Sequence, residues 1–270
     1  AENHPLNGLV LAGGLSWREV SLLRTYQAYL SQVQVSTSRQ FITRTLLAHP
    51  ECATHIYRYF EAKFRPDFSE RELAMRQRRE EFFDSLNAVS SLAYDSTLRA
   101  LFNLVESTLR TNFFLEKDFI SHKISSRDVL EMPDPRPLYE IVVVGRNVEG
   151  IHLRGGPVAR GGLRWSDRPD DYRTEVLGLM KTQMTKNAVI VPVGSKGGFV
   201  IKNSPHKREE LMAFVQEQYK TFIRGLLDLT DNNKGGRVLH PSGLVIYDQP
   251  DPYLVVAADK GTATFSDIAN

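Results

Sequence analysis

The stretch GGLRWSDRPDDYRTEVLGLMKTQMTKNAVIVPVGSKGGFV, residues 161–200, decides the fold class of this chain. It holds a glycine pair, a helix-like segment around residues 172–186, the apolar run AVIVPVG and, after GSKGG, a second short apolar run. Strand-like runs that alternate with helices predict an α/β layer with a mixed, partly parallel sheet. The same stretch carries Arg164, Lys186 and Lys196, and this raises the question of what so many cations bind.

The residues before this stretch have a different pattern. Residues 16 to about 124 read as successive helices, with Ser16 and Ser69 as expected caps and Pro50 as an expected first residue. The proline-rich segment EMPDPRP, residues 131–137, then breaks the helical pattern. We therefore expect a helical region over residues 1–130 and an α/β substrate-binding domain over residues 131–270.

Composition excludes several classes of protein. With 34 basic and 32 acidic residues the net charge is +2, and this charge is too small to indicate a protein that binds nucleic acid through its overall electrostatic field. No apolar run approaches the ~20 residues that cross a bilayer, so no membrane partner is expected. The single cysteine, Cys52, favours a reducing cytoplasm, and the scattered histidines predict no metal site.

Lys196 lies in VPVGSKGGFV, between two apolar runs and beside three glycines. We interpret GSKGG as a tight turn, at which backbone without side chains lets a ligand come close to the lysine. An exposed turn lysine with no function fits the pattern equally well. A phosphate-binding loop does not fit, because that motif places its lysine after the glycines and leads into a helix.

Two neighbouring motifs add polar side chains. In PVARGGLRW a glycine pair separates Arg160 from Arg164, so that both guanidinium groups can point into a cleft and hold a carboxylate. In KTQMTKNA, Gln183 and Lys186 are three residues apart and share a helix face. Solvated arginines on a surface hairpin remain the alternative.

Asp259 follows the apolar run YLVVAA near the end of the chain. An acid at the carboxyl end of a strand lies where α/β sheets bind ligands, and it can exchange protons with a reacting amine. It can equally be the cap of a following helix.

Taken together and in this order, GGLRW, MTKNA, VPVGSKGG and AADKGT resemble the substrate-binding half of the glutamate, leucine, phenylalanine and valine dehydrogenase superfamily. Residues 161–200 and AADKGTATFSDIAN resemble the large NAD-specific glutamate dehydrogenases of bacteria most. The resemblance covers about residues 137–270. It implies oxidative deamination of L-glutamate to 2-oxoglutarate and ammonia.

The resemblance also implies roles for single residues. Lys196 matches the catalytic lysine that assists the attack of water and polarises the oxo group. Asp259 matches the aspartate that exchanges a proton with the amino nitrogen. Lys186 matches the lysine that binds the α-carboxylate, with Gln183 on the same helix face. Arg160 takes the position of a lysine that binds the side-chain carboxylate of glutamate.

Three departures from the family pattern leave alternatives open. Because Arg160 replaces a lysine, the side-chain carboxylate can belong instead to Arg154. GSKGG is one residue shorter than the family's motif. The interval between Lys186 and Lys196 is compressed, so Lys181 is a second candidate for the α-carboxylate.

Hydride transfer needs a nicotinamide, yet the chain contains no G-x-G-x-x-G motif after a strand. The resemblance implies that NAD is bound mainly by a Rossmann domain after residue 270, that this chain alone is inactive, and that the full-length protein is a homo-oligomer. The alternatives are a leucine, valine or phenylalanine dehydrogenase, a nucleotide-binding module, and a non-catalytic helical interaction module.

Overall fold

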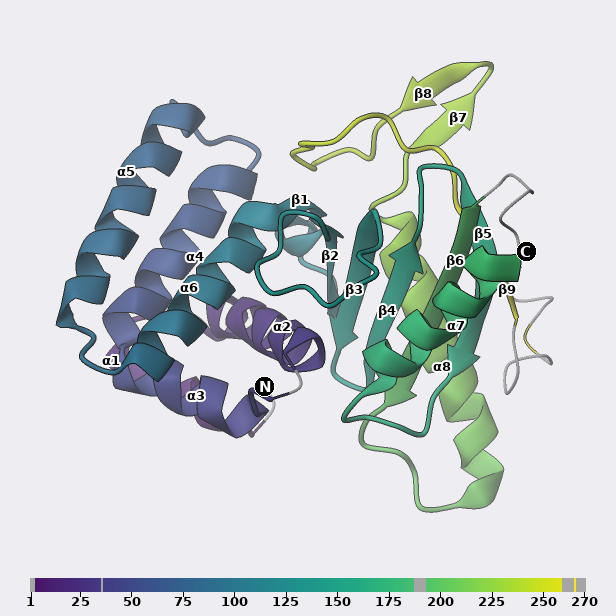
Figure 1. The fold of residues 1–270 in the computed structure, drawn as a ribbon, viewed down its shortest axis with the longest axis horizontal. Coiled ribbons are helices and arrows are strands. Elements are labelled where there is room, and N and C mark those ends of the chain that lie inside the picture. Colours follow the sequence, from purple (N-terminus) through teal and green to yellow (C-terminus); the bar gives the residue numbers. More distant parts are fainter. Residues whose placement is uncertain (1–2, 35, 187–192, 259–264, 266–270) are drawn as a thin grey trace.

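The computed structural model describes residues 3–34, 36–186, 193–258 and 265. Helices come first in the chain and strands dominate later, as Figure 1 shows. The helices are η1 (Pro5–Asn7), α1 (Gly8–Ala12), α2 (Trp17–Val33), α3 (Arg39–Ala48), α4 (Pro50–Phe64), α5 (Arg71–Ser85), η2 (Leu86–Ala88), α6 (Leu92–Ser107), η3 (Phe113–Leu115), α7 (Tyr172–Lys186) and α8 (Arg208–Leu227).

Seven of the described strands form one mixed sheet in the order β1-β2-β3-β4-β6-β5-β9. The pairs from β1 to β6 are antiparallel, whereas β5 pairs in parallel with both β6 and β9. This confirms the expected α/β class with a partly parallel sheet. The strands are β1 (Thr108–Thr111), β2 (Phe119–Ser125), β3 (Tyr139–Gly145), β4 (Val148–Arg154), β5 (Ala159–Trp165), β6 (Val193–Ile201), β9 (Val255–Ala258) and a separate hairpin of β7 (Asn232–Lys234) and β8 (Arg237–Leu239).

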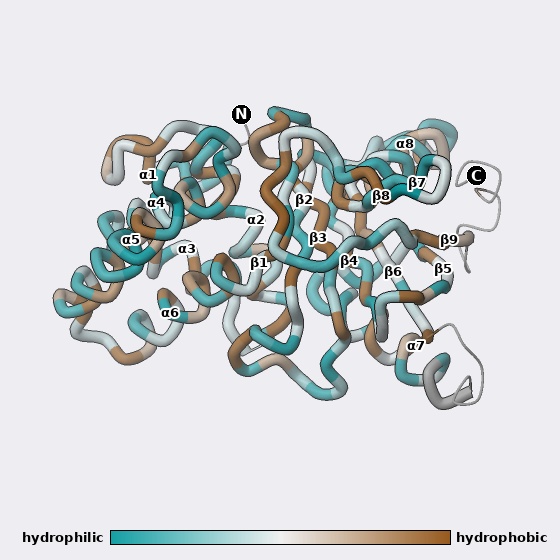
Figure 2. Tube along the Cα trace, turned by 90° about the horizontal axis from the view of Figure 1, so that it is seen from above, coloured by the Kyte–Doolittle hydropathy of each residue, from teal (hydrophilic) through white to brown (hydrophobic). Residues whose placement is uncertain are grey.

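The two faces of the sheet are covered by different helices. Along β3, Val142 and Val144 belong to the apolar core shared with the helical region and α7, whereas Ile141 and Val143 belong to the core under α8. This alternation is the two-residue period of a strand buried on both faces. Figure 2 accordingly shows α8 on one side of the sheet and α7 on the other.

Two of the three expected helix-start residues, Ser16 and Pro50, are confirmed. Ser16 caps α2 through a reciprocal pair of bonds with Glu19, Ser38 caps α3, and Pro50 is the first residue of α4. Ser69 is not a cap, because α5 begins one residue later, after Glu70 in a left-handed conformation.

The expectation of helices as far as residue 124 is wrong. Thr108–Thr111 and Phe119–Ser125 form β1 and β2, which extend the sheet toward the helical region. The run STLRT continues a helical period in sequence, but Thr108 and Arg110 pair with β2, so tertiary pairing overrides the local pattern.

GSKGG is also not a turn. Residues 193–201 form the single continuous strand β6, which pairs with β4 on one side and β5 on the other. Among the described residues, no helix is long and apolar enough to span a membrane.

Candidate functional site

The parallel part of the sheet brings three predicted segments side by side. β5 lies between β6 and β9, and Arg160 is opposite both Gly194 and Val255. Lys196 lies two residues farther along β6. The PVARGG and GSKGG motifs therefore form neighbouring strands, although 36 positions separate Arg160 from Lys196 in the sequence.

Glycine is required where these two strands meet. A Cβ on Gly161 would lie 1.6 Å from the carbonyl oxygen of Ser195, a distance at which backbone atoms overlap. Gly161 and Gly162 consequently leave bare backbone between Arg160 and Leu163. Bare backbone is what a site needs where a ligand approaches the sheet closely.

Helix α7 adds Gln183 to the same region. Its Nε2 donates a hydrogen bond of 3.2 Å to the carbonyl oxygen of Arg160, and a Cβ on Gly194 would lie 3.0 Å from its Oε1. The first turn of α7 is held by Glu175, which accepts from Arg164 Nη1 at 2.7 Å and from Ser166 Oγ at 2.6 Å.

Arg160, Gln183 and Lys196 line one cavity of about 340 Å³, a volume within the range of pockets for small ligands. Lys196 is half-buried in it and Arg160 is exposed at its rim. We call this cavity the Lys196 pocket. Its walls are formed by Arg160, Gly161, Gly162, Gln183, Lys196, Val255 and Ala257.

Two predicted site residues cannot be placed. Asp259 lies outside the described residues, and so does the side chain of Lys186, which is the last residue of α7. In sequence, Asp259 follows two positions after Ala257, which lines the Lys196 pocket.

Arg164 and Arg154 do not enter the Lys196 pocket. Arg164 forms an ion pair with Glu175, and Arg154 is buried in an ion pair with Asp251, 2.5 Å from Nη1 to Oδ2. Burial raises the pKa of Asp251, but Arg154 and Lys123 more than offset it and hold that pKa below its usual value. Arg154 therefore neutralises a structural carboxylate rather than a substrate.

The nucleotide-binding alternative is also excluded. A phosphate-binding loop delivers its ligand to a helix N-terminus. Here the chain continues as strand β6 to Ile201, and α8 begins only at Arg208.

Sequence reasoning did not find the wall provided by β9. Val255 and Ala257 are alternate residues of that strand, and both line the Lys196 pocket. The only sequence signal was the small, apolar character of VVAA just before Asp259. Among the residues that the structure describes, no group of three or more His, Cys, Asp or Glu side chains is placed to hold a metal ion.

Comparison with known proteins gives matches over the whole chain. Residues 81–270 match the family model described as bacterial NAD-glutamate dehydrogenase, catalytic domain, and residues 1–66 match glutamate dehydrogenase, helical motif 3.

The curated relatives are also named as glutamate dehydrogenases. The chain is 48% identical to the NAD-specific glutamate dehydrogenases of Halomonas elongata and Pseudomonas aeruginosa over its full length, and 46% identical to that of Mycobacterium tuberculosis over 98% of it. It spans 17% of the length of each of these relatives. The resemblance read from GGLRW, MTKNA, GSKGG and AADKGT is thus confirmed, and the chain belongs to the bacterial NAD-glutamate dehydrogenase family, of whose catalytic domain it contains a part.

Proposed function

We propose that this chain supplies the substrate-binding and proton-transfer residues of an NAD-dependent glutamate dehydrogenase, which deaminates L-glutamate to 2-oxoglutarate and ammonia. One observation carries the proposal: Arg160, Gln183 and Lys196, from β5, α7 and β6, line a single pocket. The names of the relatives supply the reaction class.

The substrate has a carboxylate at each end, so a pocket that orients it needs a cation for each carboxylate. We assign the side-chain carboxylate to Arg160, whose planar guanidinium can hold it through two hydrogen bonds. We assign the α-carboxylate to Lys186, with Gln183 beside it. An apolar substrate such as leucine would leave Arg160 without a partner, and this favours glutamate over the leucine, valine and phenylalanine alternatives.

Lys196 lies between these carboxylate sites in the proposed arrangement. Its Nζ would position the water that attacks the iminium carbon, and in the reverse direction it would donate a hydrogen bond to the oxo group of 2-oxoglutarate. Asp259 would exchange the proton of the amino nitrogen. Each assignment is a proposal about this chain's own residues.

Two connections lead from a described sheet strand into a long helix, residues 166–171 and 202–207, and neither contains the glycine that a dinucleotide-binding turn needs. We propose that NAD is bound mainly by a Rossmann domain outside this chain, and that the chain alone is inactive.

Further parts of the proposal concern organisation. We propose a helical region and an α/β substrate-binding domain within this chain, a homo-oligomer for the full-length protein, and a cytoplasmic location. The cytoplasmic location is supported by Cys52, a buried free thiol. The interaction-module alternative is disfavoured because Arg160, Gln183 and Lys196 converge on one pocket rather than scatter.

The test is Lys196→Ala in the full-length protein. Loss of a group that acts on protons in the transition state should lower kcat by roughly a hundredfold or more. Steady-state kinetics with glutamate and NAD measure this. The matched control is Lys220→Ala, which removes a surface lysine of α8 and should leave kcat unchanged. Wild-type kcat in Lys196→Ala would refute the assignment.

A further inference from the structure

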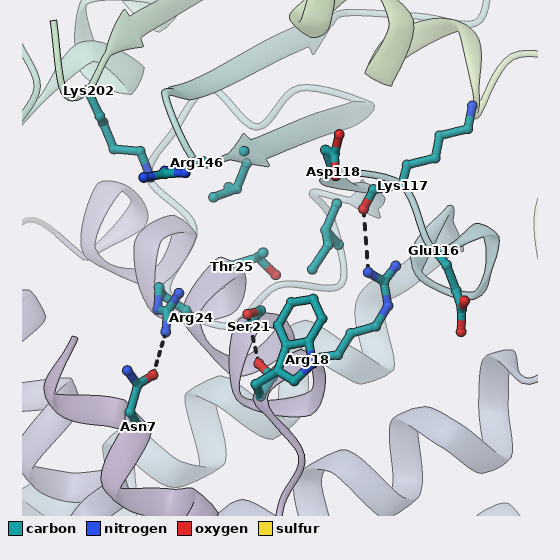
Figure 3. Close-up of a pocket in the computed structure, with 14 residues that line it drawn as sticks. Asn7, Arg18, Ser21, Arg24, Thr25, Glu116, Lys117, Asp118, Arg146 and Lys202 are labelled. Atoms are coloured by element: carbon teal, nitrogen blue, oxygen red, sulfur yellow. Dashed lines mark hydrogen bonds between the residues drawn. The ribbon is translucent and has the colours of Figure 1, made fainter. Parts of the chain in front are cut away.

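A second cavity, larger than the Lys196 pocket, lies where the helical region meets the sheet. Its volume is about 530 Å³, and Figure 3 shows the side chains around it. The walls come from η1, α2, the segment before β2, the turn between β3 and β4, and the residue that follows β6. We call it the seam pocket and define it by its five cationic lining residues, Arg18, Arg24, Lys117, Arg146 and Lys202.

The lining of the seam pocket has an excess of positive charge, because these five cations face only two acidic residues. Lys117 is turned to one side: its Nζ lies 2.5 Å from Asp228 Oδ1, and in Figure 3 its amino group points away from the centre. Apart from Lys117, the cationic part of the lining consists of Arg18, Arg24, Arg146 and Lys202.

Among the described residues, Arg18 and Arg146 form no ion pair; Arg18 instead donates to the carbonyl oxygens of Phe113 and Lys117. Lys202 lies 3.4 Å from Glu149, but that carboxylate also accepts two hydrogen bonds from Arg39. The residues that line this concave surface therefore include more cations than acids, and an excess of positive charge raises the local concentration of anions.

Neutral groups complete the seam pocket. Arg24 Nη2 donates to Asn7 Oδ1 at 3.0 Å, an interaction that holds the guanidinium at the pocket wall. Ile120 and Val144 provide apolar surface, and the Trp17 side chain is 62% exposed. A wall with apolar patches and several cations suits an organic anion better than a bare inorganic ion.

We propose that the seam pocket binds a small organic polyanion, with at least two phosphate or carboxylate charges, through Arg24, Arg146 and Lys202. The site stands apart from the Lys196 pocket. Lys196 and Lys202 are six residues apart on or just after strand β6, which separates them by about 20 Å of extended chain. The proposal does not depend on the reaction proposed above.

The experiment is titration calorimetry on the full-length protein at low ionic strength with two probes, tripolyphosphate and citrate. We expect saturable binding of at least one probe, and the tighter one identifies phosphate or carboxylate as the preferred group. Arg146→Ala and Lys202→Ala should each weaken binding by about tenfold, since each removes a charged contact.

Arg146 is exposed, so its removal does not threaten the fold. The matched control is Arg237→Ala, an exposed arginine on β8 away from the lining, which should bind the probes as wild type does. Absence of saturable binding to wild type overturns the proposal. Binding that is unchanged in both variants, or weakened equally in Arg237→Ala, overturns it as well.

Discussion

Two histidines are buried inside the sheet and stay neutral at ordinary pH. His122 on β2 and His152 on β4 are each 1% exposed. His122 Nε2 lies 2.8 Å from Thr25 Oγ1, whereas neither ring nitrogen of His152 has a hydrogen-bond partner among the described residues. Burial lowers the pKa of each histidine to about 3. The fold therefore excludes the protonated form of both rings.

This burial predicts a loss of stability in mild acid. Histidine in the unfolded chain has a pKa near 6.5, so between pH 6.5 and 3 the unfolded state binds more protons than the folded state. The free energy of unfolding therefore decreases as the pH is lowered through this range. From pH 7 to 5.5 the loss should be about 1 kcal/mol for each of the two histidines.

Urea unfolding at these two pH values measures the loss. In His152→Leu, a residue that cannot be protonated, the drop should shrink by about half, whatever the variant's absolute stability. An identical drop in wild type and His152→Leu would contradict the burial of an ionisable ring at this position.

The arginines near the site show the limit of sequence reasoning at this scale. Arg154, Arg160 and Arg164 were all candidates for binding a carboxylate, and their local contexts did not separate them. What separates them is an acidic partner outside each motif: Asp251, 97 positions away, pairs with Arg154, and Glu175, 11 positions away, pairs with Arg164. Only Arg160 lines the Lys196 pocket, and a pattern confined to neighbouring residues contains no sign of that difference.

At the scale of elements, strand β6 is where local interpretation failed for a physical reason. Glycines in GSKGG indicated a turn, but their role is close packing. A Cβ on Gly197 would lie 2.3 Å from Leu163 Cδ2, and one on Gly198 would lie 2.6 Å from Val176 Cγ2. Glycine there lets β5 and α7 approach a continuous strand, and sequence alone does not distinguish this need from the need for a turn.

Helices were easier to predict than strands in this chain. A cap or a first proline acts within one turn, so α2 and α4 began where Ser16 and Pro50 indicated. Strands β1 and β2 depend on partners across the sheet, and the sequence of β1 continued a helical period. Element type was thus predictable wherever the determining contact was local.

Gly161 offers a test of the β5–β6 pairing. In Gly161→Ala the new Cβ would meet the Ser195 carbonyl oxygen, so the two strands must separate, at a cost of about 1–3 kcal/mol in the free energy of unfolding. Urea unfolding measures the change.

Gly178→Ala provides the matched control for Gly161→Ala. This glycine lies inside α7, where no atom outside its own stretch of helix backbone and its chain neighbours lies within 4 Å of the position that a Cβ would take. Alanine there should stabilise the helix by about 0.5–1 kcal/mol. Equal stability of Gly161→Ala and Gly178→Ala would show that the two strands do not meet as described.

At the scale of the whole molecule, buried charges join parts that are distant in sequence. Glu140 on β3 accepts hydrogen bonds from Arg173 of α7, at 2.6 and 3.0 Å, and from Tyr29 of α2, at 2.9 Å. This cluster fixes the helical region and α7 to the same face of the sheet. Buried pairs of this kind position elements, because a displaced partner would leave a buried charge without compensation.

A second cluster anchors the segment that leads into β9. Arg110 of β1 pairs with Asp231 and Asp248, and Lys123 of β2 pairs with Asp248 and Asp251. Burial raises the pKa of Asp231, but hydrogen bonds from Arg110 and its other partners outweigh that effect and lower it to about 2. Asp231 therefore remains ionised at neutral pH, and the cluster holds the chain that enters the Lys196 pocket.

The alternation of strand-like runs with helices predicted the α/β class, and the family motifs predicted three of the residues in the Lys196 pocket. Neither signal predicted the charge clusters or the seam pocket, because each joins side chains that form no motif together; Tyr29 and Glu140 are 111 positions apart, and Arg110 and Asp231 are 121 apart. The sequence therefore specified which groups line the Lys196 pocket better than it specified what holds them in place.

The central claim is that Arg160 and Lys196 hold opposite parts of one dicarboxylate. The most direct measurement is a structure of the full-length protein with bound 2-oxoglutarate. We expect the ligand in the Lys196 pocket, with one carboxylate within hydrogen-bond distance of Arg160 and the oxo group beside Lys196 Nζ. A ligand bound elsewhere, with Arg160 and Lys196 making no contact to it, would contradict the claim.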